Sequence, residues 1–189
     1  MGQFVFHTTP LRDLLSIEAK AFADERGFFM ETYNKGDFEK NNFFEQFVQD
    51  NLSLSQKGVV RGLHYQIPPN AMGKLVRCIK GQIFDVGVDI RQGSPTFGKW
   101  YGEVLSGENF KMLYLPPGFA HGFMALENDT YVSYKCTGIY SPKDERAIVW
   151  DDKEIGINWP VNAVGGKVIV SDRDKAHPGI SAAETNFKY

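Results

Sequence analysis

Short segments in which apolar and polar residues alternate run along most of the chain. The most regular segment covers residues 82–90, where Phe84, Val86, Val88 and Ile90 fall on one face of an extended strand. Turn residues separate the segments about every 8–12 residues, which is typical of an all-β sandwich or barrel. Residues 14–22 are expected to be a strand that leads into a loop. The segments expected to be extended are residues 4–7, 28–33, 47–53, 59–66, 75–79, 82–90, 98–105, 110–115, 122–126, 130–137 and 147–150.

One segment has the spacing of a helix instead. Residues 37–47 place Phe38, Phe43 and Phe47 on one side, and Asp37 is a residue type that often caps a helix N-terminus. We therefore predict a helix over residues 37–47. Elsewhere strands do not alternate with helices, which excludes a parallel α/β sheet, and a Lys-Gly turn at residues 80–81 predicts a hairpin.

Length and charge describe an ordinary globular protein. The 189 residues fit one domain over residues 1–189, and a net charge of −2 without a basic stripe argues against nucleic acid and against an anionic membrane surface. The chain has no apolar run long enough for a membrane span and no signal-peptide pattern at its start. Cys78 and Cys136 fit no zinc spacing and are predicted to be buried thiols in a reducing compartment, so we expect a cytoplasmic protein.

Residues 59–66 carry the first candidate chemistry. On a regular strand Val60, Gly62, His64 and Gln66 would share one face, and a glycine beside a histidine suggests a close approach to the backbone. A metal site is not expected there, because Gln66 is a poor ligand for a transition metal. The other histidines do not complete a ligand set, since His121 lies in a Gly/Pro turn and His7 and His177 lie in terminal segments.

Acid–base chemistry without a metal fits the residues better. His64 is a natural base near neutral pH, and a carboxylate partner would fix its tautomer. Tyr134 could return a proton, and Lys74 could neutralise a developing oxyanion. The candidate partners of the histidine are Asp85, Asp172 and Asp174.

Three arginines are candidates for binding phosphate. Arg26, Arg61 and Arg173 could each grip a phosphate with two hydrogen bonds. Arg61 and His64 have opposite parity, so either Gly62 marks a bulge or Arg61 reaches around an edge. The chain has no Walker loop, no Gly-x-Ser-x-Gly motif and no Gly-x-Gly-x-x-Gly motif. Their absence argues against a P-loop NTPase, an α/β-hydrolase with a nucleophile elbow and a dinucleotide-binding fold.

Ordered sequence blocks along nearly the whole chain resemble the dTDP-4-dehydrorhamnose 3,5-epimerase family of dTDP-6-deoxy-sugar epimerases. The blocks are Asp24-Glu25-Arg26-Gly27-Phe28-Phe29, Gln49-Asp50-Asn51, Arg61-Gly62-Leu63-His64, Gly73-Lys74-Leu75-Val76-Arg77, Phe84-Asp85-Val86, Asp89-Ile90-Arg91, Ser94-Pro95-Thr96-Phe97-Gly98, Pro117-Gly118-Phe119-Ala120-His121-Gly122-Phe123, Tyr134-Lys135-Cys136 and Trp150-Asp151-Asp152.

The resemblance implies a double-stranded β-helix, that is, a cupin-like jelly-roll barrel with short peripheral helices, and a homodimer. It implies epimerisation at C3 and C5 of a dTDP-4-keto-6-deoxyhexose, converting dTDP-4-dehydro-6-deoxy-D-glucose to dTDP-4-dehydro-L-rhamnose in dTDP-L-rhamnose biosynthesis, without a metal or organic cofactor. By motif position it makes His64 the base, Tyr134 the acid, Asp174 the partner of His64, and Lys74 the fourth catalytic residue. The implied substrate contacts are Arg26, Phe29, Glu31, Gln49, Asn51, Arg61, His121, Glu145 and Arg173.

Several alternatives stay open at this point. The protein could be a metal-dependent jelly-roll isomerase or oxygenase, an epimerase that inverts only C3 or only C5, or a nucleotide-sugar binding module without activity. Retention of His64, Lys74, Tyr134 and Asp174 argues against a mere binding module. Residues from a second chain could also enter the site, and the segment around Phe28 and Phe29 is where we expect them.

Overall fold

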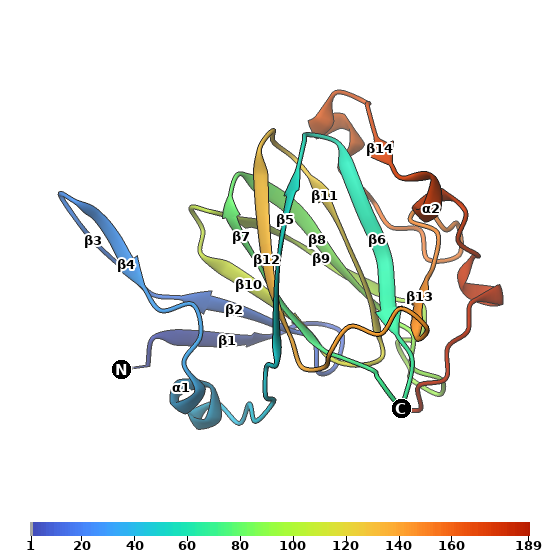
Figure 1. The fold of residues 1–189 in the computed structure, drawn as a ribbon, viewed down its shortest axis with the longest axis horizontal. Helices are drawn as coiled ribbons and strands as arrows, with labels where there is room; N and C mark the ends of the chain where they lie inside the picture. The colour runs from blue at the N-terminus through green and yellow to red at the C-terminus, as the bar shows by residue number, and fades with distance from the viewer. Residues whose placement is uncertain (1) are drawn as a thin grey trace.

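Two sheets, antiparallel except for the pairing of β14 with β6, form the body of the protein in this computed structural model, which describes residues 2–189 (Figure 1). The first sheet has the order β1 (Phe4–Thr8), β2 (Leu15–Ala19), β10 (Lys111–Leu115), β7 (Lys74–Lys80), β12 (Thr130–Cys136) and β5 (Gln49–Ser55). The second has the order β13 (Glu145–Ala147), β6 (Val59–Gln66), β11 (Phe119–Ala125), β8 (Gln82–Asp89) and β9 (Trp100–Ser106), and β14 (Ile169–Val170) adds to β6. The expected jelly-roll fold is confirmed.

The apolar core lies between the two sheets. Val76 and Leu113 of the first sheet pack with Ile83, Phe119 and Phe123 of the second. Alternation does not by itself identify the inner face. On β8 it is Ile83 that enters the core between the sheets, whereas Val86 and Val88, from the more apolar face, lie on the outer side of the second sheet.

The hairpin predicted at residues 80–81 is wrong. Strands β7 and β8 follow each other directly, but they belong to different sheets, so Gly81 turns a corner of the sandwich. Gly81 has a φ of +77°, and a Cβ there would lie 2.4 Å from the Thr130 hydroxyl. The local turn signal is the same for a hairpin and for a corner, because it reports the backbone of the turn and not which strands pair.

The predicted helix over residues 37–47 is also wrong in its bounds. Helix α1 covers Lys35–Lys40, and its N-cap is Asn34, whose side chain accepts a hydrogen bond from the Asp37 backbone N–H. Phe43 and Phe47 lie beyond the helix, but they still pack with Phe38 against the first sheet. Aromatic packing therefore set the apolar spacing, and the helix itself ends after less than two turns.

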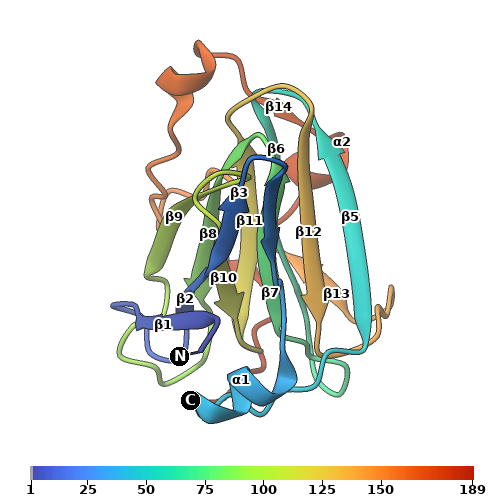
Figure 2. The same ribbon diagram turned by 90° about the vertical axis from the view of Figure 1, so that its left-hand side faces the viewer.

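A two-stranded arm projects away from the body. Strands β3 (Ala21–Asp24) and β4 (Gly27–Met30) pair only with each other, and the arm reaches out beside β1 and β2 (Figures 1 and 2). Residues 14–22 are expected from the sequence to be a strand that leads into a loop, but they contain β2 and the start of β3. Phe28 and Phe29 on the arm are 57% and 69% exposed, which is unusual for large apolar side chains.

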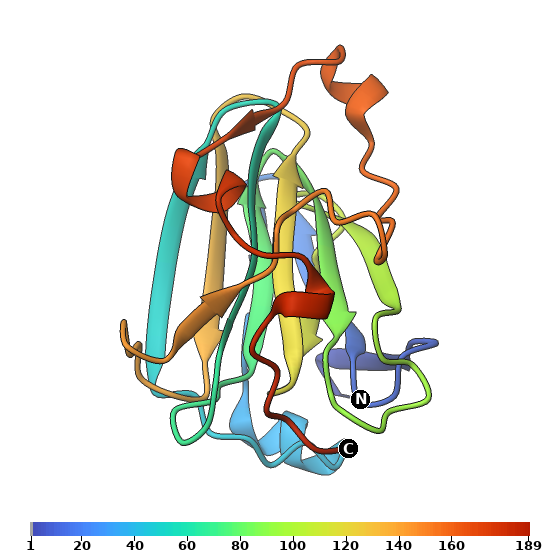
Figure 3. The ribbon, with the colours of Figure 1, turned by 90° about the vertical axis from the view of Figure 1, so that its right-hand side faces the viewer.

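The C-terminal segment crosses the outer face of the second sheet (Figure 3). It contains the 3₁₀ helices Val161–Val164 and Ile180–Ala182 and the one-turn helix α2 (Asp172–Lys175). Ile155, Ile180 and Phe187 of this segment pack on Val86 and Val88 of β8. As a result the second sheet is buried on both faces, and α2 is held beside β6.

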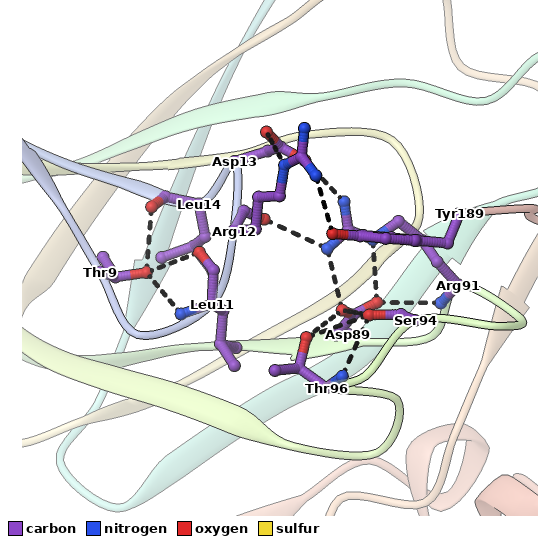
Figure 4. A network of polar contacts seen from close by, with 10 residues as sticks. All are labelled: Thr9, Leu11, Arg12, Asp13, Leu14, Asp89, Arg91, Ser94, Thr96 and Tyr189. Carbon is purple, nitrogen blue, oxygen red and sulfur yellow. Dashed lines mark hydrogen bonds and ion pairs between the residues drawn. The ribbon is translucent and has the colours of Figure 1, made fainter.

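A buried ion network fixes one end of the sandwich. Asp89 accepts hydrogen bonds from the Arg91 Nε at 2.9 Å and from the hydroxyls of Ser94 and Thr96, both at 2.6 Å, and Tyr189 lies over Arg91 (Figure 4). Burial alone would raise the pKa of Asp89, but these donors outweigh it and lower the pKa. The network ties the C-terminal residues to the sheet.

Among residues 2–189, no helix combines the length and the apolar character that a membrane crossing requires.

Candidate active site

A cleft with two lobes opens between the two sheets. Each lobe has a volume of about 270 Å³. His64, Lys74 and Tyr134 are the residues that line both lobes. These are three of the four residues expected to be catalytic, and they come from β6, β7 and β12, so rigid strands hold them.

A bulge in β6 turns His64 into the cleft. His64 pairs with His121 of β11, and Arg61 pairs with Phe123. Between these two pairs β6 advances by three residues and β11 by two, so β6 contains one extra residue. Gly62 in the bulge has a φ of +138°, and a Cβ there would lie 2.5 Å from the Gly122 Cα. The extra residue lets Arg61 and His64 line the same lobe, as the bulge interpretation expected.

The bulge also changes the face that was expected for Val60. Val60 packs in an apolar cluster with Met124 and Val164 and does not share the cleft with His64. Gln66, beyond the bulge, does line the cleft with His64. A regular period of two therefore describes each half of β6 but not the whole strand.

His64 is paired with Asp174. Its Nε2 lies 2.9 Å from Asp174 Oδ1, and Asp174 also accepts from the Gly62 backbone N–H at 3.5 Å. Asp174 lies in α2, whose N-cap Ser171 accepts from the Asp174 N–H at 3.0 Å. Burial raises the pKa of Asp174, but the His64 hydrogen bond and charge outweigh it, so the pKa is lowered overall and Asp174 is a carboxylate at neutral pH.

The structure decides among the three carboxylates considered for His64. Asp172 is exposed and pairs with Lys175 at 3.2 Å. Asp85 pairs with the other histidine of the cleft, since His121 Nε2 lies 2.8 Å from Asp85 Oδ1. Asp174 is therefore the partner of His64, as the resemblance implied.

The His121–Asp85 pair is almost fully enclosed. Burial raises the pKa of Asp85 and lowers the pKa of His121, and both shifts favour the uncharged forms. Among the described residues, Asp85 Oδ2 has no hydrogen-bond partner. The His121 ring lies 6.5 Å from the Tyr134 ring and lines one lobe of the cleft, whereas Asp85 is fully buried and does not line it.

Lys74 and Tyr134 lie next to each other. The Lys74 ammonium lies 5.8 Å from the centroid of the Tyr134 ring. Desolvation lowers the pKa of Lys74, and the charges of Cys136, Glu145 and Asp85 offset only part of this. Desolvation raises the pKa of Tyr134, so its phenol keeps its proton at neutral pH and can donate it.

Polar side chains of both lobes surround these groups. Arg61 is oriented by hydrogen bonds from its Nε to the Ser55 hydroxyl at 3.1 Å and from its Nη2 to the Leu54 carbonyl at 3.1 Å. Arg173 forms an ion pair with Glu145, which joins the two lobes. Gln49 and Asn51 line one lobe and are hydrogen-bonded to each other at 3.1 Å.

Three of the expected substrate contacts do not lie at this cleft. Arg26 is exposed on the arm, where it pairs with Asp24, and Phe29 lies on β4 of the same arm. Glu31 accepts a hydrogen bond from the Asn34 side chain at 2.9 Å. A single chain thus brings together His64, Lys74, Tyr134, Asp174, Gln49, Asn51, Arg61, His121, Glu145 and Arg173, but not Arg26, Phe29 and Glu31.

Two residues of the site were missed from the sequence. Tyr140 lines the cleft and donates to Glu145 at 2.8 Å. His177 follows α2, and its Nε2 lies 3.7 Å from Asp174 Oδ1. Nothing near either residue in the sequence marked it, although the spacing of three residues between Asp174 and His177 would place them together if they lay on one helical turn.

Sequence and structure comparisons agree with this geometry. A sequence model of a protein family, described as dTDP-4-dehydrorhamnose 3,5-epimerase, matches residues 8–182. The chain belongs to this family of epimerases. A curated dTDP-4-dehydrorhamnose 3,5-epimerase of Shigella flexneri is 53% identical over 167 residues, which cover 88% of this chain and 90% of that protein.

Solved structures of family members superpose on the whole fold. The Legionella pneumophila dTDP-6-deoxy-D-glucose-3,5-epimerase in complex with dTDP-4-keto-L-rhamnose has a TM-score of 0.93 and 43% identity, covering 98% of both chains. A 3'-monoepimerase from Streptomyces bikiniensis in complex with dTDP-quinovose has a TM-score of 0.86 and 31% identity, covering 93% of this chain and 87% of that one. The same fold therefore occurs with epimerisation at two centres and at one.

Proposed function

We propose that the protein epimerises dTDP-4-dehydro-6-deoxy-D-glucose at C3 and C5 and yields dTDP-4-dehydro-L-rhamnose. The observation that carries this proposal is that His64, Lys74 and Tyr134 meet where the two lobes join, with Asp174 bonded to His64. The family members of greater identity, such as the one at 53%, are named as 3,5-epimerases, which supports epimerisation at both centres.

His64 acts as the base. The C4 ketone acidifies the C–H bonds at C3 and C5, and removal of a proton sends the electron pair of the C–H bond to the C4 oxygen. The tautomer that donates Nε2–H to Asp174 leaves the Nδ1 lone pair to accept this proton. Asp174 then stabilises the imidazolium that forms.

Lys74 and Tyr134 complete the reaction. The Lys74 ammonium stabilises the enolate oxygen more strongly than the neutral ketone, which is the differential binding that catalysis requires. Tyr134 donates its phenolic proton to carbon from the opposite face, the C4 carbonyl re-forms, and the centre is inverted. The neutral phenol that its raised pKa maintains is the form this step uses.

Turnover in D₂O tests the reaction directly. We expect NMR of the recovered sugar to show deuterium at both C3 and C5, because each centre loses its proton to the protein and receives one that has exchanged with solvent. Deuterium at one centre only would replace the proposal with a single-centre epimerase, like the Streptomyces bikiniensis relative. Tight binding of the substrate without exchange would favour a binding module.

The arm supports the proposal of a homodimer. Arg26 and Phe29 are exposed on an arm that extends away from its own cleft, and Phe22 and Phe28 add to its apolar surface. A second copy of the chain would cover this surface, and the arm would carry Arg26 and Phe29 to the cleft of the partner. Glu31 at the base of the arm would move with them.

A mixed dimer tests this arrangement. One chain carries His64→Ala and the other Arg26→Ala, and two different tags allow the heterodimer to be isolated. If the arm acts on the partner's cleft, one of the two sites is intact and about half of the wild-type activity returns. If each arm serves its own cleft, both sites are damaged and the heterodimer stays as inactive as the parents.

One domain over residues 1–189, a cytoplasmic location and catalysis without a cofactor stay predictions.

A further inference from the structure

We propose that His64, Asp174 and His177 form an inhibitory binding site for a first-row transition-metal dication such as Zn²⁺. The proposed function makes no use of His177, which lies beside the His64–Asp174 pair. The proposal concerns a regulatory ion that disables the base and not a metal that takes part in the epimerisation.

The three donor atoms have the spacing of a metal site. Asp174 Oδ1 lies 2.9 Å from His64 Nε2 and 3.7 Å from His177 Nε2, and all three donors lie within 4.8 Å of one another. Ligand atoms of a tetrahedral zinc site lie roughly 3.3 Å apart, because each is about 2.0–2.1 Å from the metal. Small side-chain rotations therefore suffice to bring the three atoms onto one ion.

His177 has a donor atom with no other use. Its Nε2 is buried, and among residues 2–189 it has no hydrogen-bond partner. The His177 ring packs edge-on to the His64 ring, with centroids 6.1 Å apart. A buried nitrogen without a hydrogen-bond partner destabilises the folded protein relative to one that is bonded. A metal ion would provide the missing partner.

The ligand types select the class of ion. Two imidazoles and one carboxylate suit Zn²⁺, Cu²⁺ or Ni²⁺, whereas Mg²⁺ and Ca²⁺ prefer oxygen ligands. Arg173 is the nearby cation that would oppose binding, but Glu145 is paired with it. The remaining coordination positions would face the cleft and hold water.

Binding would inactivate the base. The ion takes the place of the Nε2 proton of His64, which is released to solvent, and the Asp174 carboxylate becomes a metal ligand. The positive charge on the imidazole then reduces the basicity of Nδ1, and the metal-bound water fills the lobe. This consequence rests on the proposed function, but metal binding itself does not.

Calorimetric titration of the substrate-free protein with ZnCl₂ tests the binding. We expect one site in the wild type, affinity at least about tenfold weaker in His177→Ala, and no binding of MgCl₂ at the same concentrations. His7→Ala is the matched control, because His7 is an exposed histidine on β1 whose one ionic partner among residues 2–189 is Glu18. It should bind Zn²⁺ as the wild type does.

Two outcomes overturn the proposal: a wild type that binds no Zn²⁺, and a His177→Ala protein that binds it as tightly as the wild type. If His177→Ala does not fold, anomalous scattering at the zinc edge from wild-type crystals decides, since the ion must lie within bonding distance of His64, Asp174 and His177. An epimerase assay with Zn²⁺ then tests inhibition separately. We expect a chelator to restore turnover, and a zinc-loaded protein with full activity would refute the inhibitory role alone.

Discussion

The cleft contains two histidine–aspartate pairs of nearly identical geometry and opposite surroundings. The His64–Asp174 pair is joined at 2.9 Å and the His121–Asp85 pair at 2.8 Å. The His64 side chain is 26% exposed, whereas the side chains of His121 and Asp85 are 7% and 0% exposed. The distance between the partners is therefore not what separates their roles.

The carboxylates show what the surroundings change. Asp174 gains the Gly62 N–H as a further donor, and its pKa falls, while Asp85 has an oxygen without a partner and its pKa rises. An anionic Asp174 can stabilise an imidazolium each time His64 takes a proton. Burial disfavours the charged form of Asp85, which makes this carboxyl a weaker stabiliser of an imidazolium than Asp174.

The largest expected effect is the contrast between His64→Ala, which should lose activity, and His121→Ala, which should lose stability. We expect His64→Ala to lose about 10²- to 10⁴-fold in kcat with little change in substrate binding, because it removes the base. We expect His121→Ala to be destabilised by about 1–3 kcal/mol, since it leaves the Asp85 carboxyl buried without its hydrogen bond. Steady-state kinetics and urea unfolding of both variants measure the two effects, and near-normal turnover of His64→Ala would sink the assignment.

Substitution of Lys74 tests what its ammonium contributes to catalysis and to stability. We expect Lys74→Met to lose about 10²- to 10³-fold in kcat, because the enolate oxygen loses its cation. The same change should increase stability at neutral pH. The pKa of Lys74 is lowered from 10.5 by burial, so between the lowered pKa and 10.5 the unfolded chain binds more protons and wild-type stability rises with pH.

The measurement is the free energy of unfolding at pH 7 and at pH 10 for the wild type, Lys74→Met and Lys80→Met. Lys80 is exposed at the end of the same strand and serves as the control. The increase in the free energy of unfolding between pH 7 and pH 10 should be present in the wild type and in Lys80→Met, and absent in Lys74→Met. An unchanged rise in that variant would show that the buried ammonium does not limit stability.

The smallest expected effect is a difference between Asp174 and Asp85 in how each makes the free energy of unfolding depend on pH. Asp174 has a lowered folded pKa, so its contribution is present above its ordinary value of 3.8 and is lost as the pH falls through the lowered pKa. Asp85 has a raised folded pKa, so stability falls as the pH rises from 3.8 through the raised pKa. Each slope is at most about 1.4 kcal/mol per pH unit.

Urea unfolding of Asp174→Asn and Asp85→Asn from about pH 2 to pH 7 reads both slopes, because the Asp174 window lies below 3.8 and the Asp85 window above it. The difference between wild type and variant should change with pH in opposite directions for the two positions. Equal slopes would mean that the two pairs have the same electrostatic surroundings despite their different exposure.

Local pattern predicted most of the fold but not how its strands assemble. Alternation located the strands, yet the turn at Gly81 was read as a hairpin because the signal carries no information about which sheet follows. The helix start was placed at Asp37, although Asn34 is an equally good cap three residues earlier. Both errors arise where the tertiary contacts decide between local alternatives.

The site shows the same limit. Residue types alone left Asp85, Asp172 and Asp174 as equal partners for His64, since the true partner lies 110 residues away and is positioned by packing of the C-terminal segment. Only the family resemblance selected Asp174. His177 carried no signal, and Arg26, Phe29 and Glu31 lie away from the cleft of their own chain.

The location of Asp174 after every barrel strand has a consequence for how the protein is made. The 110 residues between His64 and Asp174 take roughly 5 to 20 seconds to synthesise at usual rates of translation. During that time a nascent chain can pair its sheets and shape the cleft while the base still lacks its carboxylate. The His64–Asp174 pair therefore forms only when the C-terminal segment has docked on the second sheet, so the pair reports completed synthesis and not merely a formed barrel.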